Sequence, residues 1–372
     1  MNIRWIRLIY IGVCILTSCG HKSSDNENIE KINNTAICLT YSDEDSLKKY
    51  ERIGVPRYII LEEDESSLIA EIGKILIYND TIYILDRVGS RSIASYDMNG
   101  MPIRTYGVRG KGFGKYKFPW DMDVDDNKVY VLDRNRSKLI SYLRNGQAER
   151  EVNLPFRADG FSLIGNSEFI FSIDPSEKLE YLLCITDSLI KNRRFLLKRS
   201  KDFVGGWLTA NVLRKDKSGI SYYQSPTDYI YNIFHDGEIT SAVRIDFGSS
   251  SIPDPIKNDF SKAYSTDILK DKHFFLDNPI RLNDSTFLGR VVGGDNNSVI
   301  FREIGEEYKE NSVIKNVGLL EILHPIGKDD NGNIIGYYTP EDLELQYDFD
   351  NVPDSIVQSL KDGKKVVALY RL

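Results

Sequence analysis

Short hydrophobic runs separated by turn residues dominate the chain from about residue 50 onward. Two of them, Thr81–Leu85 and Lys128–Leu132, are rich in the β-branched and aromatic residues that favour strands. A second strand-like run follows each one and ends in an Asn-Gly pair, Asn99-Gly100 or Asn145-Gly146, which is the strongest short signal for a hairpin. No long helical period of apolar residues accompanies these runs. The pattern therefore predicts an all-β protein.

The strand-like runs recur as a repeat. Thr81–Arg87 is matched by Lys128–Arg134, and Asp133 follows the equivalent Asp86 by 47 positions. A period in the forties with several strands per unit is typical of a propeller blade. Weaker copies of the pattern lie at four further places: Glu168–Asp174, Ile220–Tyr223, Ser285–Gly289 and Asn333–Tyr338. Six units predict a six-bladed β-propeller.

The two ends of the repeat region are suited to close the ring. Val366–Tyr370 and Arg57–Leu61 are both strand-like, and pairing them in one blade would remove an exposed sheet edge. Short helical inserts are expected at Asp254–Ala263 and Asp354–Leu360, because each begins directly after a proline.

The first 19 residues have the three parts of a secretory signal. Arg4 and Arg7 give a charged start, Leu8–Leu16 an apolar core, and Leu16–Cys19 an end made of Leu, two small residues and Cys. The apolar run is shorter than the roughly 20 residues that a helix needs to span a bilayer. We therefore predict a signal peptide over residues 1–18, in preference to a short buried strand.

The Leu-Thr-Ser-Cys end resembles the lipobox of bacterial lipoproteins. This resemblance implies cleavage before Cys19, lipid on its thiol, and attachment to a membrane through that lipid. We expect a lipid anchor and flexible tether over residues 19–50 and the propeller over residues 51–372. Ser24–Glu27 resembles an export signal of gut-type Bacteroides lipoproteins. We expect an outer-membrane location, on either the cell surface or the periplasmic face.

The chain from about Tyr58 to Leu372 also resembles the six-bladed β-propeller lipoproteins of Bacteroides-type bacteria, with repeats similar to NHL repeats. The matching pieces include Ile82–Arg87, the glycine-rich loop Gly110–Tyr116, and the terminal Val366–Leu372. That loop departs from the usual family sequence at Lys111, Phe113 and Lys115. The resemblance implies a fold and a cellular location and carries no established activity.

Composition narrows the range of functions. The formal net charge is −7, whereas a general nucleic-acid binder needs a basic face, so we predict no nucleic-acid partner.

Cys38 and Cys184 remain after cleavage and could either pair or stay separate. No Gly-x-Ser-x-Gly or Cys-x-x-Cys occurs, so we predict no catalytic residue, metal or cofactor. No His or Cys stands at ligand spacing from any of the four histidines, His21, His235, His273 and His324.

Two arginines are candidates for ligand binding. Arg87 and Arg134 occupy equivalent positions in the first two repeats, after Asp86 and Asp133, whose carboxylates we expect to accept hydrogen bonds from backbone amides. The stretch from Arg87 to Lys117 contains seven basic residues and one acidic residue. These cations form either a solvated set of loops or a patch for the carboxylates of acidic glycans or peptides.

Trp120 and Asp121 complete the set of candidates. Trp120 lies where an inner strand begins, so it could stack on a sugar ring or belong to the core. Asp121 and Asp123 point to one face of that strand, where they could meet a ligand or remain solvated.

Three functions fit these features. The leading hypothesis is a non-enzymatic binding lipoprotein that presents a propeller face to a glycan, a peptide or a protein. The second is a propeller enzyme of the lyase, hydrolase or lactonase type, which requires Asp121, Asp123 and Arg134 to converge on one cavity. The third is a scaffold subunit of an outer-membrane complex.

Overall fold

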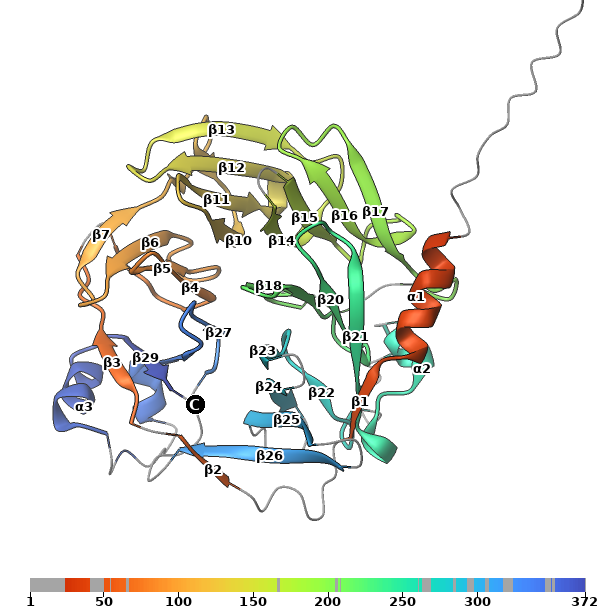
Figure 1. The fold of residues 1–372 in the computed structure, drawn as a ribbon. Helices are drawn as coiled ribbons and strands as arrows, with labels where there is room; N and C mark the ends of the chain where they lie inside the picture. Colours follow the sequence, from red (N-terminus) through yellow and green to blue (C-terminus); the bar gives the residue numbers. More distant parts are fainter. Residues whose placement is uncertain are drawn as a thin grey trace, which may run out of the picture.

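The chain forms a ring of six β-sheets arranged around a central axis, as the computed structural model shows (Figure 1). The structure describes residues 24–40, 50–53, 55–64, 67–165, 168–204, 207, 209–259, 261–262, 269–283, 286–292, 298–304, 308–316, 324–344, 349 and 352–371. The six sheets around one axis confirm the predicted six-bladed β-propeller. The predicted signal peptide and Cys19 lie outside the described residues.

The first three blades are four-stranded antiparallel sheets in which each strand pairs with the next along the chain. Blade 1 contains β4 (Lys74–Tyr78), β5 (Thr81–Leu85), β6 (Ile93–Asp97) and β7 (Pro102–Thr105). Blade 2 contains β10 (Pro119–Val124), β11 (Lys128–Asp133), β12 (Lys138–Leu143) and β13 (Ala148–Asn153). Blade 3 contains β14 (Ala158–Ile164), β15 (Glu168–Ile173), β16 (Tyr181–Asp187) and β17 (Arg193–Lys198).

The next two blades each gain an outer strand from the N-terminal segment. Blade 4 contains β18 (Leu213–Asp216), β19 (Gly219–Tyr222), β20 (Tyr229–Ile233), β21 (Ile239–Asp246) and the added β1 (Ile37–Thr40). Blade 5 contains β22 (Phe274–Phe275), β23 (Ile280–Asn283), β24 (Thr286–Val292), β25 (Ser298–Ile304), β26 (Tyr308–Asn316) and the added β2 (Tyr50–Ile53). Both added strands run parallel to their neighbours.

The sixth blade closes the ring with strands from both ends of the repeat region. It contains β27 (Gly327–Lys328), β28 (Ile334–Tyr338), β29 (Val366–Tyr370) and β3 (Arg57–Ile60). β3 pairs antiparallel with β29, which confirms the closure expected from the sequence. The outer strand of this blade also contacts blade 1, where a Cβ on Gly100 would lie 1.8 Å from the Ile60 carbonyl oxygen. Only glycine fits that turn.

The hydrophobic core is divided among the interfaces between blades. Six hydrophobic clusters of the described residues lie between successive blades around the ring. Between blades 1 and 2, for example, Tyr83 and Leu85 pack with Met122 and Val124. Because neighbours cover a blade on both faces, the middle strands are buried at nearly every position, which explains their continuous apolar runs.

The N-terminal segment differs from the flexible tether that we expected over residues 19–50. Helix α1 (Ser24–Asn34) contacts β21 and β17, and its Ile32 is buried in the cluster between blades 3 and 4. Leu39 of β1 is likewise buried against blade 4. Helix α1 and strands β1 and β2 thus pack on or pair with the blades of the propeller.

Helical inserts follow the two prolines as expected. Helix α2 (Asp254–Lys257) begins after Pro253 and is shorter than expected, whereas α3 (Asp354–Lys361) begins after Pro353 and covers the expected range. Short 3₁₀ helices occur at Arg134–Arg136, Gly248–Ser250 and Pro340–Leu343.

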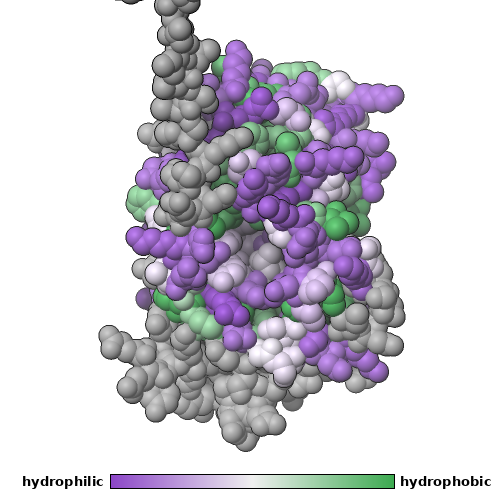
Figure 2. Space-filling model, turned by 90° about the vertical axis from the view of Figure 1, so that its right-hand side faces the viewer, coloured by the Kyte–Doolittle hydropathy of each residue, from purple (hydrophilic) through white to green (hydrophobic). Residues whose placement is uncertain are grey.

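Cys38 and Cys184 are separate thiols, and Cys184 is buried between blades 2 and 3. Among the described helices, none combines the length and apolar character that a membrane crossing requires. The side of the ring that carries α1 shows mainly hydrophilic residues around small hydrophobic patches (Figure 2).

Candidate functional site on the top face

The top face of the propeller, defined as the end where the first strand of each blade begins, carries the predicted site residues. Two aspartates fix its loops. The Asp133 carboxylate accepts hydrogen bonds from the backbone N–H groups of Lys117 and Phe118 at 2.7 and 3.2 Å. The Asp86 carboxylate accepts hydrogen bonds from backbone N–H groups in two neighbouring loops. The donors are Ala70, Glu71, Val88, Gly89 and Ser90. The expected role of both carboxylates is confirmed.

The structure brings Arg87, Trp120 and Arg134 together. The guanidinium carbon atoms of Arg87 and Arg134 lie 5.5 and 5.3 Å from the centroid of the Trp120 ring, within the range of cation–π attraction. Phe118 extends the group. Its ring stacks on that of Trp120, with the two centroids 5.7 Å apart, and the guanidinium carbon of Arg91 lies 5.1 Å from the Phe118 centroid. Two stacked aromatic rings are therefore flanked by cations on this part of the top face.

Arg87 and Arg134 differ in how fully the protein uses their guanidinium hydrogen-bond donors. Arg87 is buried, and its guanidinium donates to the carbonyl oxygens of Trp120 and Gly73 and to the side chain of Asn211. Arg134 is partly exposed and forms an ion pair with Asp174 through Nη2. Its Nε is buried and has no hydrogen-bond partner among the described residues. Arg87 thus holds the loops together, whereas Arg134 keeps 18% of its side chain exposed and presents that part of the guanidinium to the top face.

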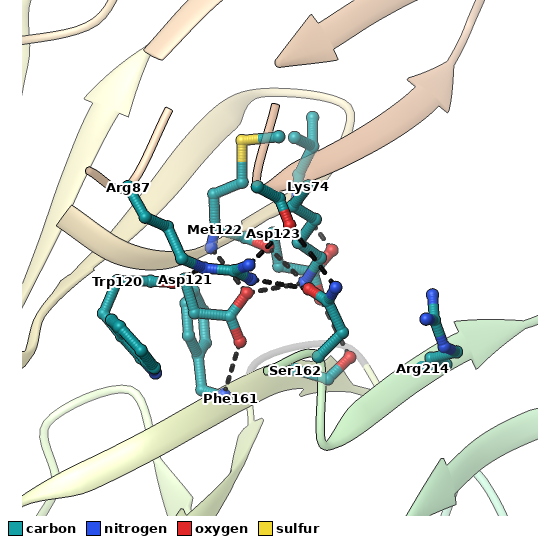
Figure 3. A network of polar contacts seen from close by, with 12 residues as sticks. Lys74, Arg87, Trp120, Asp121, Met122, Asp123, Phe161, Ser162 and Arg214 are labelled. Carbon is teal, nitrogen blue, oxygen red and sulfur yellow. Dashed lines mark hydrogen bonds and ion pairs between the residues drawn. The ribbon is translucent and has the colours of Figure 1, made fainter. Parts of the chain in front are cut away.

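Asp121 lies deeper than the aromatic group and is engaged by the protein itself (Figure 3). Its carboxylate accepts a hydrogen bond from Lys74 Nζ at 2.7 Å and one from the Phe161 backbone N–H at 3.0 Å. Asp123 similarly accepts the Leu163 N–H at 2.7 Å. Both side chains point to one face of β10, as predicted, and there they satisfy backbone amides at the inner edge of blade 3. They do not converge with Arg134 on a cavity.

Ion pairs fill the axis of the ring. Besides the Lys74–Asp121 pair, two further ion pairs lie here. Arg281 Nη2 is 2.6 Å from Asp216 Oδ1, and Arg214 Nη2 is 2.7 Å from Asp277 Oδ2. A cavity of about 50 Å³ remains between the first strands of the blades. Because these buried charges are paired across blades, they fix the positions of the inner strands rather than offer an open axial site.

Asp159 is a residue of the top face that the sequence reasoning missed. Its backbone carbonyl accepts a hydrogen bond from Trp120 Nε1 at 2.8 Å, and Oδ1 of its buried side chain has no hydrogen-bond partner among the described residues. The pKa of Asp159 is raised to about 7, chiefly by burial and also by the nearby Asp174, while Ser172 and Arg134 act to lower it. Asp159 therefore binds the Trp120 indole through its backbone and carries a buried carboxyl that is largely protonated below pH 7.

Asp159 and Trp120 occupy matching backbone positions. Each lies at a register shift between the first and second strand of its blade, between Pro119 and Asp121 in one case and between Ala158 and Gly160 in the other. Aligning the first strands of blades 2 and 3 in the sequence would have placed Asp159 at the position of Trp120 and so identified it.

The basic stretch noted in the sequence reaches the top-face loops at Lys117, whose backbone N–H bonds Asp133. Most of its members lie in the segment between β7 and β10, which is held by the short strands β8 (Val108–Arg109) and β9 (Lys115–Tyr116) and by Arg136. Four of its cations are largely exposed and form no ion pair with other described residues: Arg109, Lys111, Lys115 and Lys117. Of these four, Lys117 directly precedes Phe118. We call the group formed by Arg91, Lys117, Phe118, Trp120 and Arg134 the cation–aromatic patch.

Fold and site together define a six-bladed propeller with an aromatic, basic patch at one end of the ring. The chain belongs to the family described as "Domain of unknown function (DUF4934)", whose sequence model matches residues 37–364. No curated protein matches it.

Two solved structures are similar to this one. The first, from Bacteroides fragilis and assigned as an exported protein, has a TM-score of 0.69 at 16% identity, with coverage of 91% of this chain and 99% of the other. The second, a member of the DUF4221 family from Bacteroides vulgatus, has a TM-score of 0.54 at 11% identity, with coverage of 86% and 97%. At these identities the likeness shows the fold.

Proposed function

We propose that this protein is an exported, lipid-anchored binding protein whose cation–aromatic patch binds a carboxylate-bearing ligand, either an acidic glycan or a peptide. The observation that carries the proposal is the pairing of the Trp120 ring with Arg134. An aromatic ring can stack on a sugar ring or an apolar side chain, and a guanidinium with free donors can bind a carboxylate. Arg91 and Lys117 add positive charge beside Phe118, which attracts anions in a chain whose net charge is negative.

The neighbouring acids support binding rather than turnover. Asp121 and Asp123, on which the enzyme hypothesis depended, accept hydrogen bonds from Lys74 and from the backbone of blade 3. Their lone pairs are therefore used in holding the inner strands together. Asp159, whose backbone carbonyl binds the Trp120 indole, is largely protonated below pH 7 and then adds no negative charge to this part of the top face, which favours an anionic ligand there.

The anchor rests on a different part of the chain. Leu16–Cys19 resembles a lipobox, and the structural neighbour from Bacteroides fragilis is assigned as exported. Helix α1 then begins only a few residues after Cys19, so the lipid would hold the side of the ring near blades 3 and 4 close to the bilayer. An outer-membrane location, on either face, is part of the proposal.

Calorimetric titration tests the binding site. Wild-type protein is titrated with trigalacturonate, with its neutral methyl ester, and with an acidic peptide of similar length. We expect one of the two acids to bind and the ester to bind weakly. Trp120→Ala and Arg134→Gln should each weaken binding about tenfold, through loss of stacking or of a charge-assisted hydrogen bond. Arg193→Gln, which removes an exposed charge from β17, is the control.

Three results would count against the site. They are equal affinity for acid and ester, an equal loss in the Arg193 control, or binding that survives both site substitutions. The anchor is tested separately by growing cells with labelled palmitate. Wild-type protein should carry the label and Cys19→Ala should not, whereas an unlabelled wild type would refute the anchor and leave the binding site standing.

A further inference from the structure

A groove between blades 2 and 3 opens on the bottom face, the end of the ring opposite the cation–aromatic patch. Its volume is about 500 Å³, which lies in the range of small-molecule sites. One wall is a single face of the blade 2 sheet, where Tyr130 pairs with Ser141 and Ser141 with Arg150 across adjacent strands. The opposite side includes Gly165 and Ser188 of blade 3 and Lys215 of blade 4.

The floor of the groove is apolar. It is the end of the hydrophobic cluster between the two blades, where Tyr130 packs edge-on against Phe169 with ring centroids 5.3 Å apart. The aliphatic side chains of this floor are Leu139, Val152 and Leu163. A ligand here would bury a flat or branched apolar body against these side chains.

The acids of the groove are already satisfied. Asp125 accepts hydrogen bonds from Tyr130 Oη at 2.8 Å and from two backbone N–H groups, and Asp126 accepts one from Tyr78 Oη at 2.8 Å. Glu149 pairs with Lys128 at 2.7 Å. This bond to Lys128 also lowers the pKa of Glu149. These carboxylates are therefore engaged by groups of the protein itself.

Two cations of the groove differ from the acids. Arg150 and Lys215 are exposed, and neither forms an ion pair or side-chain hydrogen bond with other described residues. The groove contains as many acids as bases, but these two cations are not held by an ion pair, so their side chains can turn toward an anionic group of a ligand. An apolar floor with two free cations at its rim fits a molecule that has an apolar body and one anionic group.

We propose that the groove between blades 2 and 3 binds a small amphipathic anion, whose apolar body packs on the floor and whose carboxylate, sulfonate or phosphate group is held by Arg150 and Lys215. This site is independent of the cation–aromatic patch, since the two lie at opposite ends of the ring. The protein would then have one ligand site on each face.

A pair of fluorescent probes tests the groove. 1-Anilinonaphthalene-8-sulfonate carries an apolar body and a sulfonate, and N-phenyl-1-naphthylamine is its uncharged counterpart. The double variant Arg150→Gln/Lys215→Gln should bind the sulfonate about tenfold more weakly, through loss of charge-assisted contacts, and should bind the neutral probe as wild type does. Arg193→Gln/Lys217→Gln makes the same change in net charge on residues that do not line the groove.

The proposal is overturned if the sulfonate binds the groove variant and wild type equally, or if the control variant loses as much affinity. It is also overturned if both probes weaken together, because the two cations would then support the fold of the groove and not an anion. A second variant, Ser188→Trp, fills the groove and should displace both probes. Retention of either probe at unchanged affinity would place it elsewhere.

Discussion

The buried carboxyl of Asp159 should make the stability of the propeller fall as the pH rises. Burial raises its pKa in the folded protein to about 7, whereas the ordinary value is 3.8. Between these two values the folded state binds a proton that the unfolded state has lost. The free energy of unfolding therefore decreases from about pH 4 to about pH 7 and levels off above that.

The size of the effect follows from the two pKa values. At pH 5 the folded carboxyl is almost fully protonated and the unfolded one is ionised, whereas at pH 8 both are ionised. Linkage then gives a loss of about 2.5 kcal/mol in the free energy of unfolding between pH 5 and pH 8. Asp159→Asn has nearly the same shape and cannot ionise, so it should lack this loss.

Urea unfolding followed by circular dichroism at pH 5 and pH 8 measures the difference. Wild type should lose about 2.5 kcal/mol more than Asp159→Asn over this interval. Other titrating groups are common to both proteins and cancel in the comparison. Asp202→Asn, an exposed residue, is the control and should follow wild type. Parallel curves for wild type and Asp159→Asn would refute the reasoning.

Further substitutions test the ring and its axis by the same unfolding measurement. Gly100→Ala and Gly332→Ala place a Cβ at nearly the same φ, +84° and +85°, but only the first would meet the Ile60 carbonyl oxygen. Gly332→Ala should cost about 1–2 kcal/mol and Gly100→Ala about 2 kcal/mol more, and equal costs would contradict the tight contact at the closing blade. Asp121→Ala leaves Lys74 buried without its partner and should cost about 3–5 kcal/mol, whereas a cost below about 1 kcal/mol would contradict the buried pair.

The sequence was sufficient for the blades because their signals are local. Thr81–Leu85 and the turn at Asn99-Gly100 carry the strand and hairpin preferences within a few residues, and the repeat multiplies them. Closure by β3 and β29 could be inferred because a ring leaves no other partner for two terminal strands. The N-terminal additions were missed because α1 is polar and contributes only isolated residues such as Ile32 to the core.

The site was predicted only in part, because its properties depend on contacts between blades. Arg87 and Arg134 were found as equivalent positions in a repeat, but their different roles depend on partners such as Asn211, far away in the sequence. Asp121 is bonded to a backbone amide 40 positions further along the chain. Asp159 precedes a glycine and reads as a turn residue, and only the packing of blades 2 to 4 buries it.

The central claim, that the top face binds a carboxylate-bearing ligand at Trp120, is tested most directly by nuclear magnetic resonance with ¹⁵N-labelled tryptophan. Trp5 lies in the predicted signal peptide, so the mature chain retains two indole groups, and Trp120→Phe assigns one of them. Titration with trigalacturonate and with the acidic peptide should shift the Trp120 Nε1–H resonance in a saturable way for one of them, and the neutral methyl ester should not. A Trp120 resonance that stays in place with both acids would contradict the account.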